Sequence, residues 1–307
     1  MDWIEASNRA AACLHGAQAV VVIVLMAWLD SRPSSTNKPG GNPFSNGGRF
    51  PVSRFVPVWD AQQPQPRIEA LDAGVFDVRA AILVFFVLSC AFHAVAALFW
   101  AGRLGAVLHF VEYSLSASVA VVAIAVEAGV RDVYTLQAQF VLVFATMLLG
   151  IAAELTQQTQ RQQQQLLPLL FHLAGWATCL SAYAPIMDTY LNSARLSALK
   201  PPAFVSALVF TEFALFACFG FVQAYALWAR QRVFSLSEES RQIMRLSLRD
   251  NDDDNGGGGG FFFPHDAQTM REIDERVEGW FIFLSLTAKT VLCWIVLSPL
   301  LLAAAAA

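Results

Sequence analysis

Seven long apolar segments divide this chain, and they constrain its fold more than any other feature. Each one approaches or exceeds the roughly 20 residues that an α-helix needs to cross a hydrocarbon layer of about 30 Å. Because that layer has no water to satisfy backbone N–H and C=O groups, we expect all of them to be helices. The sequence therefore predicts an all-α, multi-pass integral membrane protein in the plasma membrane or another cellular membrane. The segments lie near residues 10–30, 79–100, 105–128, 136–155, 166–187, 203–229 and 279–302.

The composition agrees with this class and argues against others. Hydrophobic residues make up 56% of the chain and charged residues 14%, which is outside the range of ordinary soluble domains. The net charge of -4 argues against nucleic-acid binding, which requires a basic surface. The five cysteines all fall inside apolar segments, and we interpret them as small apolar side chains without disulfide or metal-binding roles. The sequence contains no GxxxxGK, HExxH or GxSxG motif, so we expect no enzymatic turnover.

Two long connections separate the apolar segments. Residues 31–78 are rich in Pro, Gly, Asn and Ser, and we expect them to be extended and partly β. Residues 230–276 contain the run DNDDDNGGGGG, which has nothing to bury and is expected to be disordered. The earlier stretch SLSEESRQIMRLSLR would prolong the sixth helix. The first segment lacks a cleavage site, so we interpret it as a retained helix, with a signal peptide as the alternative.

Arginines and lysines near the segment ends predict the orientation, because cytoplasmic ends carry an excess of these residues. One side carries Arg9, Arg103, Arg161, Arg230, Arg232, Arg271 and Arg276, and the other carries Arg79, Arg131, Arg195 and Lys200. We therefore predict a cytoplasmic N-terminus and an extracellular C-terminus. The connection 31–78 would then be extracellular, and 230–276 would be cytoplasmic.

Lys289 lies in the middle of the last apolar segment, about ten residues or 15 Å from either end, so snorkelling is excluded. An ammonium group at that depth costs at least about 2.5 kcal/mol, so it requires a partner or the chemical removal of its charge. Glu112, in the third segment, lies at a similar depth when residues are counted from Arg103 and Glu278. We predict that the two side chains pair. The alternative is a purely structural ion pair.

Four more polar side chains lie in the same half of the predicted bundle. His15 belongs to the first segment, Ser89 and His93 to the second, and Ser285 to the last. Ser285 lies one helical turn from Lys289, and Ser89 one turn from His93, so each pair shares a helix face. Each residue alone has a simpler explanation, because histidines can be satisfied in a core and serines often bond the preceding helical turn. Together they predict a polar interior around Lys289.

The sequences around these positions resemble the heliorhodopsin family. The run FLSLTAKTVLCW resembles the retinal-attachment helix of that family, with Lys289 at the Schiff-base position. The run VEYSLSAS is similar to its counterion segment, with Glu112 as the carboxylate. Shorter matches are LHGAQ, LSCAFH and LGIAAE, which ends at Glu154, and the resemblance covers essentially all seven segments. It implies a rhodopsin-like bundle in the orientation given above and usually a homodimer.

The resemblance also implies a function and a set of site residues. Family members bind all-trans retinal covalently and are generally taken as light sensors with a slow photocycle, here with an unidentified signalling partner. The protonated Schiff base would form on Lys289, with Glu112 as its counterion. Further chromophore contacts would be Tyr113, Ser116, Met147, Gly150, Ser285 and Trp294, and proton acceptors or relays would be His15, Ser89 and His93. Trp294 has packing as its alternative role, and Glu154 is expected near the membrane surface, where capping or solvation explains it equally well.

Glu212 departs from the family pattern. It lies about ten residues from the external end of the sixth segment, near the middle of the membrane. Together with Glu112 it suggests a second hypothesis, light-gated proton conduction or transport, whereas a protonated Glu212 bonded to a neighbouring helix would be structural. A third hypothesis is a retinal-free seven-helix receptor or scaffold in which the Lys289–Glu112 pair is structural.

Overall fold

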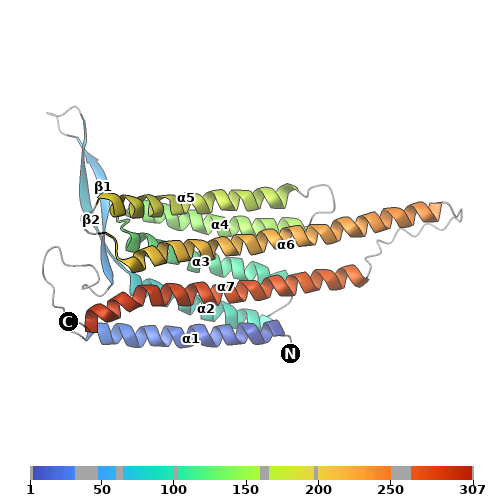
Figure 1. Cartoon of the computed structure of the whole chain (residues 1–307), viewed down its shortest axis with the longest axis horizontal. Coiled ribbons are helices and arrows are strands. Elements are labelled where there is room, and N and C mark those ends of the chain that lie inside the picture. The colour runs from blue at the N-terminus through green and yellow to red at the C-terminus, as the bar shows by residue number, and fades with distance from the viewer. Residues whose placement is uncertain are drawn as a thin grey trace.

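The structure is a computed structural model that describes residues 3–31, 48–59, 65–99, 103–159, 166–196, 200–249 and 264–305. Seven helices form an elongated bundle, and a β-hairpin lies across one end of it (Figure 1). All seven helices are long and apolar enough to cross a membrane, so the prediction of a seven-helix integral membrane protein is confirmed. The helices are α1 (Trp3–Asp30), α2 (Val78–Phe99), α3 (Arg103–Ala128), α4 (Val133–Thr159), α5 (Leu166–Leu196), α6 (Ala203–Arg249) and α7 (Pro264–Ala305).

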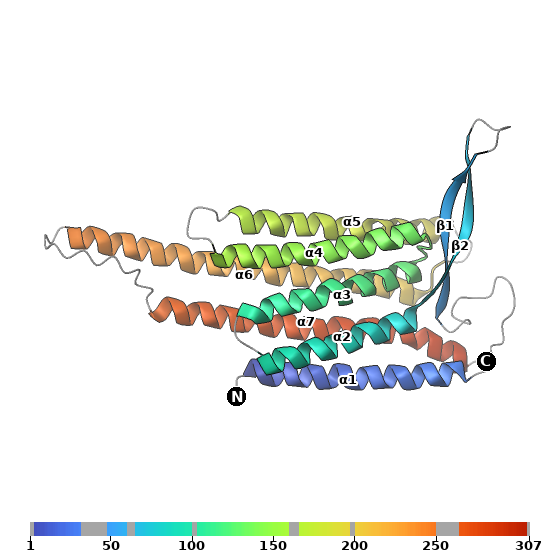
Figure 2. The ribbon, with the colours of Figure 1, turned by 180° about the vertical axis from the view of Figure 1, so that it is seen from behind.

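The chain enters and leaves the bundle at opposite ends. The N-terminus lies at one end, which we call the N-terminal end, and the C-terminus lies at the other, which we call the hairpin end (Figures 1 and 2). Helix α3 is central, because it packs against α2, α4, α5, α6 and α7, and its residues 121–126 are all buried. Outward-facing positions are apolar as well, for example Val20 and Phe221, because lipid is the solvent there.

The turn between α3 and α4 is closed by backbone hydrogen bonds. Val130 N donates to Ala125 O at 2.9 Å and Gly129 N donates to Val126 O at 3.1 Å, which is the Schellman pattern. The φ of Gly129 is 107°, a left-handed conformation that favours glycine. Asp132 then caps α4, because its carboxylate accepts a 2.8 Å hydrogen bond from Thr135 N.

The hairpin consists of strand β1 (Arg49–Val58) and the antiparallel strand β2 (Arg67–Asp77), with a register shift between Val52 and Ser53. It rests on the α3–α4 turn, since Ser53 N donates to Arg131 O at 2.8 Å. The Arg131 guanidinium also lies 4.7 Å from the centre of the Phe50 ring. The first long connection therefore contains a folded β element, which is docked on the bundle.

Asp77 joins the hairpin to α2. Its Oδ1 atom accepts a 3.0 Å hydrogen bond from Arg79 N, and its Oδ2 atom accepts one of 2.8 Å from Arg79 Nη2. Arg79 is buried and also donates to Asp30 at the end of α1, at 2.9 Å. Burial alone would raise the pKa of Asp77, but the hydrogen bonds and charge of Arg79 outweigh burial and hold this pKa below its ordinary value.

The helices extend beyond the predicted apolar segments. Helix α1 begins at Trp3 rather than near residue 10, α5 continues to Leu196, and α6 continues to Arg249, well past the neighbouring helices (Figure 1). Hydropathy measures only the apolar part of a helix, whereas residues 230–249 contain no Gly or Pro and are rich in good helix formers. The expected prolongation of the sixth helix by SLSEESRQIMRLSLR is confirmed, whereas residues 264–276, which were expected to be loop, form the beginning of α7. The run DNDDDNGGGGG lies outside the described residues.

Candidate functional site

Lys289 and Glu112 contact each other in the interior of the bundle. Lys289 Nζ on α7 lies 2.7 Å from Glu112 Oε1 on α3. Glu112 is fully buried and Lys289 is 8% exposed. The structure thus brings together the two side chains whose similar depth the sequence indicated. A buried pair of this kind is tolerated only when further hydrogen bonds satisfy both groups.

Three serines supply those hydrogen bonds. Lys289 Nζ donates to Ser285 Oγ, one turn earlier on α7, at 2.5 Å. Glu112 Oε1 accepts hydrogen bonds from Ser89 on α2 at 2.7 Å and from Ser116 on α3 at 3.1 Å. Glu112 Oε2, in contrast, is buried with no partner among the described residues. Because buried carboxylate oxygens are nearly always hydrogen-bonded, this atom indicates room for a water molecule or a ligand group.

His15 and His93 lie together on the N-terminal side of this pair. Their rings are stacked with centroids 5.5 Å apart. The Nδ1 atom of each ring has a polar partner, Gln18 at 3.1 Å for His15 and Asn8 at 2.8 Å for His93. The Nε2 atom of each ring is buried and has no partner in the described part of the chain.

Sequence reasoning missed two polar residues of α1 in this cluster. Gln18 donates to Thr290 on α7 at 2.7 Å, and Asn8 contacts His93. Asn8 lies seven residues before His15, and Gln18 lies three residues after it, so all three side chains are on one helix face. That spacing is the signal that would have found them.

A buried pair between α3 and α7 was also missed. His109 Nε2 contacts Glu278 Oε1, and each residue is 3% exposed. The His109 ring lies 5.4 Å from that of His93 and 5.8 Å from that of Tyr113, between centroids. His109 is three residues before Glu112, so it lies on nearly the same face of α3.

An apolar cavity opens beside Lys289. It has an empty volume of about 440 Å³, and its wall includes Tyr113, Met147, Phe216 and Phe219 as well as Lys289. The ring centre of Tyr113 lies 5.1 Å from Lys289 Nζ. Ser116 and Ser285 also line the cavity, so the amine and its hydrogen-bond partners are at its wall.

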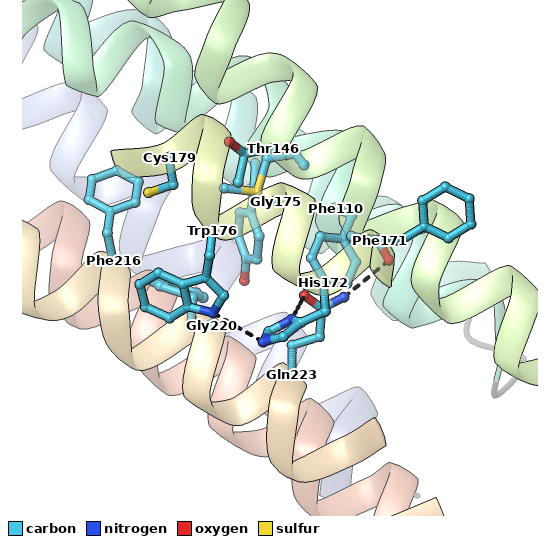
Figure 3. Close-up of a pocket in the computed structure, with 14 residues that line it drawn as sticks. Phe110, Thr146, Phe171, His172, Gly175, Trp176, Cys179, Phe216, Gly220 and Gln223 are labelled. Carbon is cyan, nitrogen blue, oxygen red and sulfur yellow. Dashed lines mark hydrogen bonds between the residues drawn. The ribbon is translucent and has the colours of Figure 1, made fainter. Parts of the chain in front are cut away.

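A second cavity, of about 550 Å³, is lined in part by residues of α5 (Figure 3). It shares Tyr113, Met147, Phe216 and Phe219 with the first, so the two cavities adjoin at these four side chains. Gly150, a predicted chromophore contact, lines the second cavity. The wall farther from Lys289 includes three side chains connected by hydrogen bonds, Trp176, His172 and Gln223.

Two glycines of this wall leave room for aromatic rings. A Cβ atom added at Gly220 would lie 2.5 Å from the Trp176 ring, and one added at Gly150 would lie 2.6 Å from the Phe110 ring. Both distances are too short for any real side chain. Larger residues at these positions would push the rings, so the shape of the space depends on the two glycines.

Glu212 of α6 lines the first cavity, as Ser116 and Lys289 do. It is 1% exposed, and its Oε1 atom has no hydrogen-bond partner among the described residues. The structure therefore places a second buried carboxyl group on the space that Lys289 borders.

Two other residues from the sequence analysis lie elsewhere. Trp294 is 49% exposed on the outer face of α7 and is not among the residues that line either cavity. Glu154 was expected to be solvated or to cap a helix, but it is fully buried. Its burial is compensated by Arg230 on α6, which donates a 2.5 Å hydrogen bond to Glu154 Oε2.

Comparison with curated proteins finds no match for the chain. The family model described as heliorhodopsin matches residues 4–235, which is more than half of the sequence and includes Glu112 and the apolar portions of α1 to α6. The matched range ends before α7. With seven membrane-spanning helices around a buried lysine, the chain belongs to the heliorhodopsin family.

Proposed function

We propose that this protein is a light-sensing photoreceptor that carries all-trans retinal attached covalently to Nζ of Lys289. The observation that carries the proposal is the position of this amine, which is hydrogen-bonded to the Glu112 carboxylate at 2.7 Å and borders an apolar cavity. Family membership supports the rhodopsin role in general. Lys289 lies outside the range that the family model matches, so its assignment depends on this geometry.

The residues around Lys289 fit a retinal molecule. The two adjoining cavities are mostly apolar and lined by aromatic rings, as ligand pockets usually are. Lysine is the side chain that forms covalent bonds with carbonyl compounds. Retinal, when bound, supplies the absorption of visible light and the change of shape that follows it.

The chain itself supplies the electrostatics. Glu112 balances the positive charge at the Lys289 nitrogen, which is favoured in a low-dielectric interior. Ser89 and Ser116 hold the carboxylate in position through hydrogen bonds to Oε1. Tyr113, Phe216 and Phe219 keep water away from the apolar part of the space. His15 and His93, whose buried Nε2 atoms have no partner in the part of the chain that the structure describes, are the candidate groups to accept or relay the proton from this site.

The direct test is the visible spectrum of the purified protein reconstituted with all-trans retinal. We expect a visible absorption band in the wild type and in the control Lys200→Ala, which removes an exposed lysine outside the cavities. Lys289→Ala should have no such band. After borohydride reduction, mass spectrometry should find the added polyene on Lys289. A visible band in Lys289→Ala would reject the attachment site, and failure of the wild type to take up retinal would favour a retinal-free receptor or scaffold.

A second candidate function, light-gated proton conduction, is supported by Glu212. This carboxyl group lines the same cavity as Lys289, and Glu112 contacts Lys289 and Ser116, which both line it. Buried acids near one cavity inside a membrane protein are candidate proton relay groups. Photocurrents in voltage-clamped cells test this function: conduction predicts currents that Glu212→Gln reduces strongly. The absence of current at every voltage, with normal membrane expression, would reject it.

We also propose a cytoplasmic N-terminus and a homodimeric state. The orientation is supported by Arg9, Arg230, Arg232 and Arg271 at the N-terminal end of the bundle. Assembly is supported by large apolar side chains on the hairpin, where Trp59 and Val75 are 72% and 63% exposed. Antibody access to an N-terminal tag in intact and permeabilised cells tests the first proposal, and native mass spectrometry tests the second.

A further inference from the structure

The His109–Glu278 pair has no part in the function proposed above, although it lies next to the site. His109 Nε2 contacts Glu278 Oε1, and both side chains are buried between α3 and α7. Glu278 precedes Lys289 by eleven residues, or about 17 Å along α7 toward the N-terminal end. The pair thus lies between the Lys289 site and that end of the bundle.

A continuous series of imidazole rings connects the pair to the site. The ring centroids are separated by 5.5 Å from His15 to His93 and by 5.4 Å from His93 to His109. The Nε2 atoms of His15 and His93 are buried and have no partner among the described residues. Buried nitrogens without protein partners are usually satisfied by internal water. Imidazoles with intervening water are efficient carriers of protons, because each ring can accept at one nitrogen and donate at the other.

Charge balance gives the pair its capacity to hold a proton. Lys289 and Glu112 neutralise each other, whereas the Glu278 carboxylate is neutralised by His109 only when that ring carries two protons. The groups around His109 are Glu278 on α7, His93 on α2, and Tyr113 and Glu112 on α3; Lys289 is the cation that acts on it from α7. A proton that moves from the Lys289 nitrogen to the pair therefore leaves the total charge of the two pairs unchanged.

The pair has little contact with the solvent. His109 and Glu278 are each 3% exposed, and Val277, next to Glu278, is 2% exposed. The Trp3 ring covers the backbone of α7 at Gly279, where an added Cβ atom would lie 2.5 Å from it. A proton that reaches Glu278 is therefore held on a buried side chain.

We propose that His109 and Glu278 form an internal proton-binding site, which takes up the proton that leaves the Lys289 nitrogen and later returns it. The inference rests on the proposed photoreceptor function. The Lys289 nitrogen becomes neutral as it loses the proton, and His93, with associated water, carries the proton to His109. The pair then holds two protons instead of one, as an imidazolium and a carboxylic acid. Return by the same route restores both charges, and no proton is lost to the solvent.

Infrared difference spectroscopy of the retinal-loaded protein tests the assignment. Illumination should produce a new carboxylic-acid C=O band in the wild type, and Glu278→Gln should abolish it. The matched control is Glu275→Gln, one turn earlier on α7, where the side chain pairs with the exposed Arg271; this variant should keep the band. A band that persists in Glu278→Gln would overturn the proposal, provided the variant still shows a light-induced spectral change.

Two further measurements separate this inference from the proposed function. In the unloaded protein, nitrogen NMR of labelled histidines should detect one doubly protonated ring in the wild type, which disappears in His109→Gln and weakens in Glu278→Gln. Absence of a doubly protonated ring in the wild type, or its persistence in His109→Gln, would reject the site without any use of retinal. A pH-indicator dye should detect no proton release from illuminated wild type, and release of one proton per molecule would reject storage. If the loaded wild type shows no light response at all, the photoreceptor function fails, whereas the NMR result still decides whether the pair holds a proton.

Discussion

Arg230 on α6 donates a 2.5 Å hydrogen bond to Glu154 on α4, and both side chains are buried. The same guanidinium donates to Asp274 on α7 at 2.8 Å and to Gln157 on α4 at 3.2 Å. One side chain thus connects three helices near the point where α6 extends past its neighbours. Its partners are far apart in the sequence, so the contacts restrict the relative positions of the helices.

Arg230→Ala is expected to destabilise the protein by about 3 kcal/mol, because it leaves the Glu154 carboxylate buried without its partner. Denaturant-induced unfolding in detergent micelles measures this change. The control is Arg271→Ala, which removes the largely exposed partner of Glu275 on α7 and should have little effect. Equal destabilisation by both substitutions would mean that burial of the Glu154–Arg230 pair has no special importance.

Glu112→Gln is expected to shift the visible absorption maximum of the retinal-loaded protein to longer wavelength. The carboxylate lies 2.7 Å from Lys289 Nζ, and it holds positive charge at that nitrogen. Removing the negative charge lets the positive charge spread along the chromophore, which lowers the excitation energy. Glu127→Gln is the control, since Glu127 is another buried acid of α3, fifteen residues farther along. Identical spectra for wild type and Glu112→Gln would show that another group balances the charge.

Gly220→Ala is expected to weaken retinal uptake. The added methyl group would lie 2.5 Å from the Trp176 ring and would push that ring from its place on the cavity wall. Overpacking of this kind costs about 1–3 kcal/mol, or about 5- to 150-fold in affinity. Titration of the unloaded protein with retinal, followed by absorption, measures the change. Gly175→Ala is the matched control, because its nearest neighbour is at 3.7 Å, and its affinity should equal that of the wild type.

The junction of β2 and α2 is expected to lose stability in acid. The pKa of Asp77 is held below its ordinary value, because Arg79 outweighs the effect of burial. The native state thus binds the Asp77 proton less readily than the unfolded state does. The stabilisation is complete above the unfolded pKa of about 3.9 and is lost as the pH falls through the lower native value. Asp77→Asn should be less stable at neutral pH and should lose this part of the acid dependence, as measured by melting temperature against pH. A parallel pH profile for the two proteins would contradict the assignment.

The seven helices and the Lys289–Glu112 contact were predictable because a membrane imposes simple rules. Helix length follows from bilayer thickness, and depth is linear in residue number along each helix. Counting residues from the segment ends was therefore sufficient to bring an amine on α7 and a carboxylate on α3 to the same level. Ser285, four residues before Lys289, shares its helix face for the same reason.

Other contacts depend on rotation about the helix axes and on distant pairing, which residue counts do not give. Trp294 follows Lys289 by five residues, which turns it about 140° away, onto the outer face of α7. The partner of Glu154 is 76 residues distant in the sequence. The residue count used Glu278 as the polar end of the last apolar segment, although its side chain is buried against His109. The polar first turns of α1 and α7 were missed because hydropathy does not detect a polar helix.

The direct passage from strand to helix at Asp77 and Val78 has a mechanical consequence. No loop intervenes, and Arg79 fastens the junction to Asp30. A neighbouring molecule that displaced the hairpin would therefore also act on the helix that bears Ser89 and His93. Because Ser89 donates a hydrogen bond to Glu112, such a displacement would reach the buried carboxylate on α3.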